Sequence, residues 1–203
     1  MITDRLLHIH LSRTGGFLFR YVLQNVGGLR ILSGANLHLT YQEMQNQVHG
    51  DVPPAVTFIR NPWEYYVSMW GWLTLAHRDG FPPAPFSAYM DRVKEGSKTN
   101  RPYMTLTHNW KLMGCEQADY IGRFERLKPE IIRILDEIIP DLISPEQTAA
   151  LLLQAPPFHI SPMPGWRYLL DRPRPYHEYY DSELKEQVQE WDGEMIERFG
   201  YTF

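Results

Sequence analysis

Short apolar runs alternate with longer periodic segments along the chain. The apolar runs that predict β-strands cover residues 6–11, 29–32, 54–59 and 119–124. The segments with helical spacing cover 17–25, 61–75, 127–138, 145–154 and 181–198, and a further one begins at Thr40. Residues 86–113 are also expected to be helical, but their apolar pattern is irregular. Continuous apolar strands that alternate with helices favour a parallel sheet covered on both faces. We therefore expect an α/β fold with three layers, α/β/α, and a central, mainly parallel sheet.

Polar residues and prolines mark several helix boundaries. Thr40 and Glu43 have the spacing of a capping box, in which each side chain accepts from the backbone N–H of the other residue. Asn61 followed by Pro62 supplies a capping side chain and a proline at the first helical position. The terminal segment predicts one continuous helix, whose core-facing positions are Leu184, Val188, Trp191, Met195 and Phe199.

The composition predicts one folded domain over residues 1–203. With 203 residues and 43% hydrophobic content, the chain can bury a sizeable core. No apolar run is long enough to cross a membrane, so we expect a soluble protein with no membrane partner. The single cysteine, Cys115, excludes an intrachain disulfide and a cysteine-based zinc cluster, which fits a reducing compartment and a cytoplasmic location.

The charge balance narrows the class of ligand. A formal net charge of −4 argues against the binding of nucleic acid or another long polyanion, because such binders usually carry a basic face. An anionic ligand of this chain must therefore be held by a few local cations.

A glycine turn joins the first predicted strand to the first predicted helix. In Ser12-Arg13-Thr14-Gly15-Gly16, several backbone N–H groups and the partial positive charge of the helix start converge on one point, which suits phosphate or sulfate. The segment lacks the Gly-Lys-Ser/Thr ending of a nucleoside triphosphate loop, which disfavours a kinase or an ATPase. Taken alone, the Gly-Gly pair is better explained by a tight strand-to-helix turn than by a ligand site.

Four segments, in order along the chain, resemble sulfotransferases that use 3′-phosphoadenosine-5′-phosphosulfate (PAPS). Ile9-His10-Leu11-Ser12-Arg13-Thr14-Gly15-Gly16 resembles the family's phosphosulfate loop, His-Ile-Pro-Lys-Thr-Gly-Gly-Thr. Phe58-Ile59-Arg60-Asn61-Pro62-Trp63 with Val67-Ser68 resembles its 3′-phosphate motif, and Gly122-Arg123-Phe124-Glu125-Arg126-Leu127 resembles its Gly-Arg-Phe-Glu-Asn-Leu strand end. Tyr176-His177-Glu178-Tyr179-Tyr180-Asp181 and Phe199-Gly200-Tyr201 resemble its C-terminal segment. The resemblance implies a P-loop, nucleotide-kinase-like fold and is strongest to the carbohydrate-acting branch.

The resemblance also implies a donor site for PAPS and no metal. The residues that it assigns to the phosphosulfate are Arg13, Thr14, Gly15, Gly16, Phe17 and Leu18, the last four through backbone N–H groups. It assigns the 3′-phosphate to Arg60 and Ser68, and pairing of Arg60 with a surface acid such as Glu64 is the alternative. The chain departs from the family at two positions. Arg13 stands in place of the loop lysine and cannot give up a proton at neutral pH, and Phe17 stands in place of a phosphate-binding threonine.

The acceptor hydroxyl needs a base, and His38 is the first candidate. It resembles the histidine of a His-x-Thr segment in related sequences, and the ordinary pKa of histidine suits proton removal near neutral pH. A histidine that only flanks a helix cap explains the same position. We expect His10 to be structural, and Trp63 either to stack near the adenine or, as is commoner early in a helix, to pack in the core. The other candidate bases are His108, His159 and His177.

We therefore expect an enzyme that transfers a sulfuryl group from PAPS to a hydroxyl of a sugar or small-molecule acceptor, and releases 3′-phosphoadenosine-5′-phosphate (PAP). Loops at 77–85 and 155–175 are expected to shape the acceptor pocket. The alternative is a protein that binds PAPS or PAP without turnover, because of Arg13 and Phe17, and a nucleotide kinase is a more distant one. The sequence does not identify the acceptor or the oligomeric state.

Overall fold

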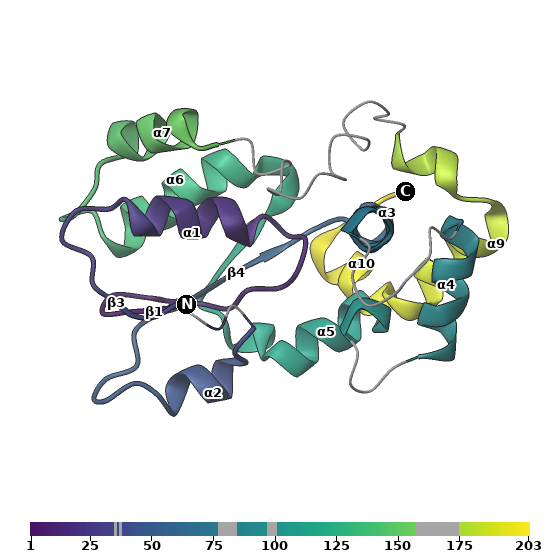
Figure 1. Ribbon diagram of the computed structural model, residues 1–203, viewed down its shortest axis with the longest axis horizontal. Helices are drawn as coiled ribbons and strands as arrows, with labels where there is room; N and C mark the ends of the chain where they lie inside the picture. The colour runs from purple at the N-terminus through teal and green to yellow at the C-terminus, as the bar shows by residue number, and fades with distance from the viewer. Residues whose placement is uncertain (35, 37, 77–84, 97–100, 157–174) are drawn as a thin grey trace. The chain divides into compact units, whose positions relative to one another are not determined.

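The computed structural model describes residues 1–34, 36, 38–76, 85–96, 101–156 and 175–203 (Figure 1). The chain divides into two compact units. The first comprises Met1–Arg60 and Trp110–Phe158, and the second comprises Asn61–Asn109 and His159–Phe203. The first unit contains the sheet, and the described part of the second is built from helices. That residues 1–203 form a single domain stays a prediction.

The first unit contains a five-stranded sheet with the order β3-β1-β2-β4-β5. Its strands are β1 (Ile2–Thr3), β2 (Leu7–His8), β3 (Ile31–Ser33), β4 (Ala55–Ile59) and β5 (Tyr120–Arg123). β4 is parallel to both β2 and β5, whereas β1 is antiparallel to β2 and to β3. All strands except β1 therefore run in one direction, which confirms an α/β fold with a mixed, mostly parallel sheet.

β1 is a strand that the sequence pattern does not predict. Two residues are too few to show an alternation, and β1 is joined to β2 by a tight turn that the Thr3 side chain closes. The hydroxyl of Thr3 donates to the carbonyl oxygen of Leu6 and accepts from the N–H of Leu6, both at 2.9 Å. Of the strand expected over 6–11, only Leu7–His8 pairs as β2. The N–H of Ile9 extends that pairing with a bond to the carbonyl oxygen of Val56 at 2.9 Å.

Helices pack on the sheet of the first unit. α1 (Gly16–Gln24), α6 (Leu127–Ile138) and α7 (Pro145–Gln154) lie on one side of it, and α2 (Tyr41–Gln45) lies on the other (Figure 1). These bounds confirm the helices expected at 17–25, 127–138 and 145–154, and the capping box of Thr40 and Glu43 is present. The core between the sheet and the first group of helices includes Leu6, Phe19, Val22, Leu23, Val56, Phe58, Ile131, Ile134 and Leu135.

The second unit contains the helix expected from 61, a helix at the start of the stretch expected over 86–113, and two helices in place of the one expected over 181–198. They are α3 (Pro62–Ala76), α4 (Phe86–Glu95), α9 (Ser182–Trp191) and α10 (Gly193–Phe199), and α5 (Leu106–Met113) continues from this unit into the first. The Oδ1 atom of Asn61 accepts from the N–H of Trp63 at 3.1 Å, which confirms Asn61 as the cap of α3. Most of the expected loops at 77–85 and 155–175 lies outside the described residues.

The prediction of one continuous terminal helix over 181–198 is wrong, because the helix breaks at Asp192 between α9 and α10. Asp192 leaves helical geometry, with φ −119° and ψ 20°, and is completely buried. Its carboxylate accepts from the hydroxyl of Tyr66 at 2.6 Å and from the N–H of Thr107 at 2.7 Å. The apolar spacing continues through the break because α9 and α10 both bury an apolar face, so periodicity alone cannot detect it.

Burial raises the pKa of the Asp192 carboxyl above its usual range, although the hydrogen bonds from Tyr66 and Thr107 oppose this. The folded protein thus holds this proton more tightly than the unfolded chain. The resulting contribution to stability is present at low pH and is lost as the pH rises through the raised pKa.

Asp192→Ala is expected to lower the free energy of unfolding by about 2–3 kcal/mol, because the Tyr66 hydroxyl and the Thr107 N–H lose their acceptor. Asp192→Asn is expected to cost less and to remove the part of the pH dependence that Asp192 contributes. Urea unfolding between about pH 4 and pH 7 measures both effects. Asp51→Asn, at an exposed carboxylate, is the matched control. An Asp192→Asn variant with the pH dependence of the parent protein would contradict this account.

Candidate functional site

The turn between β2 and α1 has an unusual backbone. Arg13 has φ 63° and Gly15 has φ 91°, so both lie in the left-handed region. Among the described residues, Arg13 is the one residue other than glycine with a positive φ. A left-handed conformation costs a residue with a side chain about 1–2 kcal/mol, and strain of this kind is concentrated at ligand sites. The turn is therefore the first candidate site.

Three hydrogen bonds hold the turn in this conformation. The buried hydroxyl of Thr14 donates to the carbonyl oxygen of Leu11 at 2.8 Å. The Nη1 atom of Arg60 donates to the carbonyl oxygen of Arg13 at 3.1 Å, and the N–H of Leu18 donates to the carbonyl oxygen of Gly15 at 3.0 Å. The turn is thus fixed by its own side chain, by the start of α1 and by a distant arginine.

Two neighbouring parallel strands position that arginine. Arg60 directly follows β4 and Phe124 directly follows β5, and Ile59 is in register with Arg123. The guanidinium carbon of Arg60 lies 3.9 Å from the centroid of the Phe124 ring, a cation–π contact that fixes the plane of the guanidinium. The strand ends therefore place a positive charge beside the backbone of Arg13.

The segment at 122–127 also packs directly on the glycine turn. A Cβ atom on Gly15 would lie 2.3 Å from a methyl carbon of Leu127, which is closer than real Cβ contacts come. Within the same segment, a Cβ atom on Gly122 would lie 2.5 Å from the ring of Phe58. The turn, Arg60 and 122–127 belong to three of the segments singled out in the sequence, and they meet at the ends of β2, β4 and β5.

The first turn of α1 carries backbone N–H groups of the kind that suit an anion. The N–H groups of Gly16 and Phe17 belong to the first turn, where a helix offers no acceptor of its own. The first turn of α1 carries no acidic residue to offset the positive end of the helix dipole. The ring of Phe17 is 51% exposed and meets His10 edge-on at 5.2 Å, so it extends outward from the turn. The N–H of Leu18 is engaged by Gly15 inside the turn.

The candidate base, His38, lies next to this turn. Its exposed ring stacks on His10 with 5.4 Å between ring centroids and 28° between planes, and its backbone N–H donates to the side chain of Asn36 at 3.0 Å. His108 and His177 belong to the second unit, where His108 is exposed and His177 stacks on Tyr176. His159 lies outside the described residues.

Two residues of the expected nucleotide site belong to the second unit. Ser68 is half-buried on α3, so its pairing with Arg60 on the 3′-phosphate stays a prediction. Trp63 is 2% exposed, and its indole N–H donates to the carbonyl oxygen of Lys185 at 3.2 Å. Trp63 thus packs in the core, as is usual early in a helix.

Comparisons with known proteins do not identify the chain. No protein-family model matches it, and a search of curated proteins finds no match.

Across the described ranges, no group of three or more His, Cys, Asp or Glu side chains is arranged to hold a metal ion. In the same part of the chain, no helix is long and apolar enough to cross a membrane.

The sequence pattern assigns no role to Phe124 or to the contact surface of His10. In the sequence, Phe124 belongs to the 122–127 segment but has no role of its own. The one signal for its role is its position directly after β5, because β5 pairs with β4, the strand that precedes Arg60. His10 follows His8 by two residues, so both side chains lie on the same face of an extended chain.

Gly15→Ala is expected to lower the free energy of unfolding by about 2–4 kcal/mol, from the left-handed backbone and from overlap with Leu127. Gly50→Ala is the matched control, because Gly50 has φ 104° but a Cβ atom there would meet nothing within 4 Å, and it should cost only about 1 kcal/mol. Chemical denaturation measures both.

Leu127→Ala is expected to cost less in the Gly15→Ala background than in the parent chain, because it removes the overlap. Two results would show that packing of the turn on Leu127 is not what requires a glycine at position 15. One is an equal loss of unfolding free energy in Gly15→Ala and Gly50→Ala. The other is strict additivity of the losses in Gly15→Ala and Leu127→Ala.

Proposed function

We propose that the chain is a PAPS-dependent sulfotransferase with a three-layer, P-loop, nucleotide-kinase-like fold, and that its acceptor is a hydroxyl of a sugar or small molecule. The observation that carries the proposal is the meeting of the strained glycine turn, Arg60 and the 122–127 segment. They meet at the carboxyl ends of parallel strands, which is where open α/β sheets bind their ligands.

Backbone and side-chain donors at this point suit a phosphosulfate group. The N–H groups of Gly16 and Phe17 would hold its oxygens, with the dipole of α1 behind them. Arg13 and Arg60 add two positive charges in a chain whose formal net charge is −4. This fits an anion that is held locally rather than by a broad basic face.

PAPS supplies the sulfuryl group, and the residues of the chain position it and manage the charge and the proton. His38 accepts the proton of the acceptor hydroxyl while the acceptor oxygen bonds to sulfur. The bond between sulfur and the 5′-phosphate oxygen breaks, and its electron pair leaves with PAP. Arg13 stabilises the negative charge that grows on the leaving phosphate, without donating a proton to it.

A protein that binds PAPS or PAP without turnover is the second candidate. Phe17 brings no hydroxyl to the turn, and the Thr14 hydroxyl is engaged with Leu11. The turn thus offers phosphate fewer hydroxyl donors than a loop with threonine at position 17 would offer. Binding and turnover need separate experiments.

PAP is expected to raise the melting temperature of the protein in a thermal shift assay, and ATP is not. Arg13→Ala and Arg60→Ala are each expected to weaken PAP binding about 10- to 100-fold, because each removes a charged donor from the phosphates. Arg133→Ala, at an arginine that pairs with Glu130 and Glu137 on α6, is the charge-matched control. Unchanged PAP affinity in both Arg13→Ala and Arg60→Ala, with both variants folded, would contradict the proposed donor site.

Labelled sulfate is expected to pass from PAPS to at least one member of a panel of sugars and small alcohols. Arg13→Ala should lower kcat about 100-fold at saturating PAPS, since it removes charge stabilisation of the leaving group. PAP binding without a labelled product on any acceptor would favour the non-catalytic alternative over the enzyme.

A further inference from the structure

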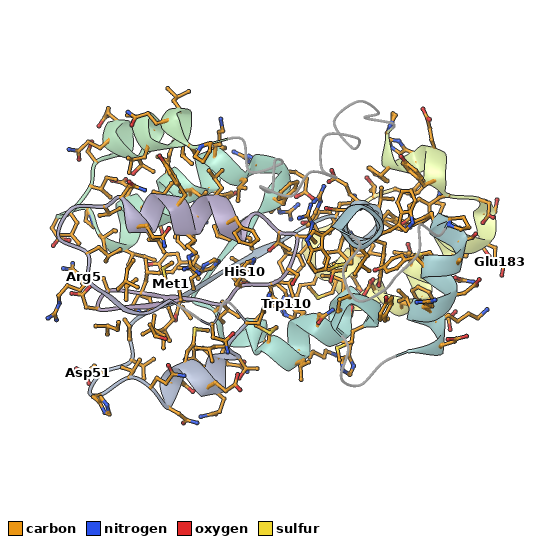
Figure 2. All side chains as sticks on the ribbon, viewed as in Figure 1. Met1, Arg5, His10, Asp51, Trp110 and Glu183 are labelled. Carbon is orange, nitrogen blue, oxygen red and sulfur yellow. The ribbon has the colours of Figure 1, made fainter. Side chains whose placement is uncertain are left out.

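A row of three histidine rings runs from the interior of the first unit to its surface. His8 and His10 are 2% and 3% exposed, and their rings stack with 5.6 Å between centroids and 16° between planes. His38 stacks on His10 in turn and is exposed. In Figure 2, His10 lies beneath the start of α1. The proposed reaction gives no part to His10, which is the ring between the other two.

His10 contacts both halves of the proposed site. A Cβ atom on Gly16 would lie 2.6 Å from the Cδ2 atom of His10, so the first residue of α1 rests directly on the imidazole. Phe17 meets the same ring edge-on, and His38 stacks on it. One buried side chain thus contacts both His38 and the start of α1.

The imidazole of His10 is held by packing, and its Nδ1 atom contributes no hydrogen bond to the described part of the chain. The Nδ1 atom of His10 is buried and finds no hydrogen-bond partner among the described residues. A buried polar atom without a partner costs free energy, and a phenylalanine ring would stack here without that cost. Burial lowers the pKa of His10 to about 3, with a further contribution from His38, so the ring stays neutral beside the exposed base.

We propose that His10 is a positioning residue for the transfer reaction: its ring is the spacer that sets where His38 stands relative to the phosphosulfate site at Gly16 and Phe17. The inference rests on the proposed function. A base must be held close to its working position, because small displacements of a reacting group reduce the rate strongly. The start of α1 and His38 belong to different segments of the chain, and the ring of His10 contacts both.

The test compares His10→Ala and His10→Phe with the parent protein, with His49→Ala as a control at an exposed histidine. Sulfate transfer from PAPS is measured with an acceptor from the panel, together with PAP affinity and the pH profile of kcat. His10→Ala should lower kcat about 10- to 100-fold and alter the pH profile of kcat, and PAP affinity should stay within about threefold. His10→Phe should recover most of kcat because it restores the stack.

A second readout does not depend on turnover. In an NMR titration, the ring resonances of His38 should shift in His10→Ala, which removes the stacked ring, and should stay displaced by ring current in His10→Phe. Three results would overturn the proposal: an unchanged His38 spectrum in His10→Ala, a loss of PAP affinity as large as the loss of kcat, or a His10→Phe variant as slow as His10→Ala.

Failure of the proposed function gives a different pattern. A parent protein that neither binds PAP nor transfers sulfate would overturn the proposed function, and the role of His10 in transfer with it, even with the expected NMR shifts. A parent protein that does both, with a His10→Ala variant of unchanged kcat and pH profile, would overturn the role of His10 alone.

Discussion

The candidate site depends on the hydrogen bond from the guanidinium of Arg60 to the carbonyl oxygen of Arg13. This bond ties the strained residue of the glycine turn to the end of β4, a strand that pairs on both sides. Phe124 holds the guanidinium from the end of the next strand. The contacts around Arg13 fix its backbone in the left-handed conformation. Because α1 follows the turn directly, the same contacts fix the position of the start of α1.

This arrangement gives Arg60 two roles in the proposed site. It supplies positive charge near the start of α1, and it supports the backbone conformation that aims the N–H groups there. Arg13 contributes to the same two features. Its own backbone is the one held in the left-handed conformation, and its side chain adds a second positive charge. Because the net charge of the chain is negative, the proposed site relies on a local pair of arginines and a helix dipole to attract its anion.

The elements that the sequence predicted are those with strong local signals. Apolar runs located β4 and β5, and caps located the starts of α2 and α3, because burial and capping act within a few residues. Periodicity missed β1, which is too short, and the break at Asp192, which depends on donors from Tyr66 and Thr107 far along the chain. The break at Asp192 comes from tertiary contacts that no local window contains.

The same limit applies to the site. The glycine turn and Arg60 were predicted from the sequence, and the structure brings them together in the first unit. The contact of Phe124 with Arg60 and the place of His10 between Gly16 and His38 depend on strand register and packing, which spacing does not reveal. Arg13 was singled out for replacing a lysine, and its positive φ is a separate property that only the backbone shows.

The most direct test of the donor site is a crystal structure of the protein with PAP. We expect the 5′-phosphate at the start of α1, with its oxygens about 3 Å from the N–H groups of Gly16 and Phe17 and with Arg13 alongside. PAP bound elsewhere on the chain, or an empty glycine turn at saturating PAP, would contradict this expectation.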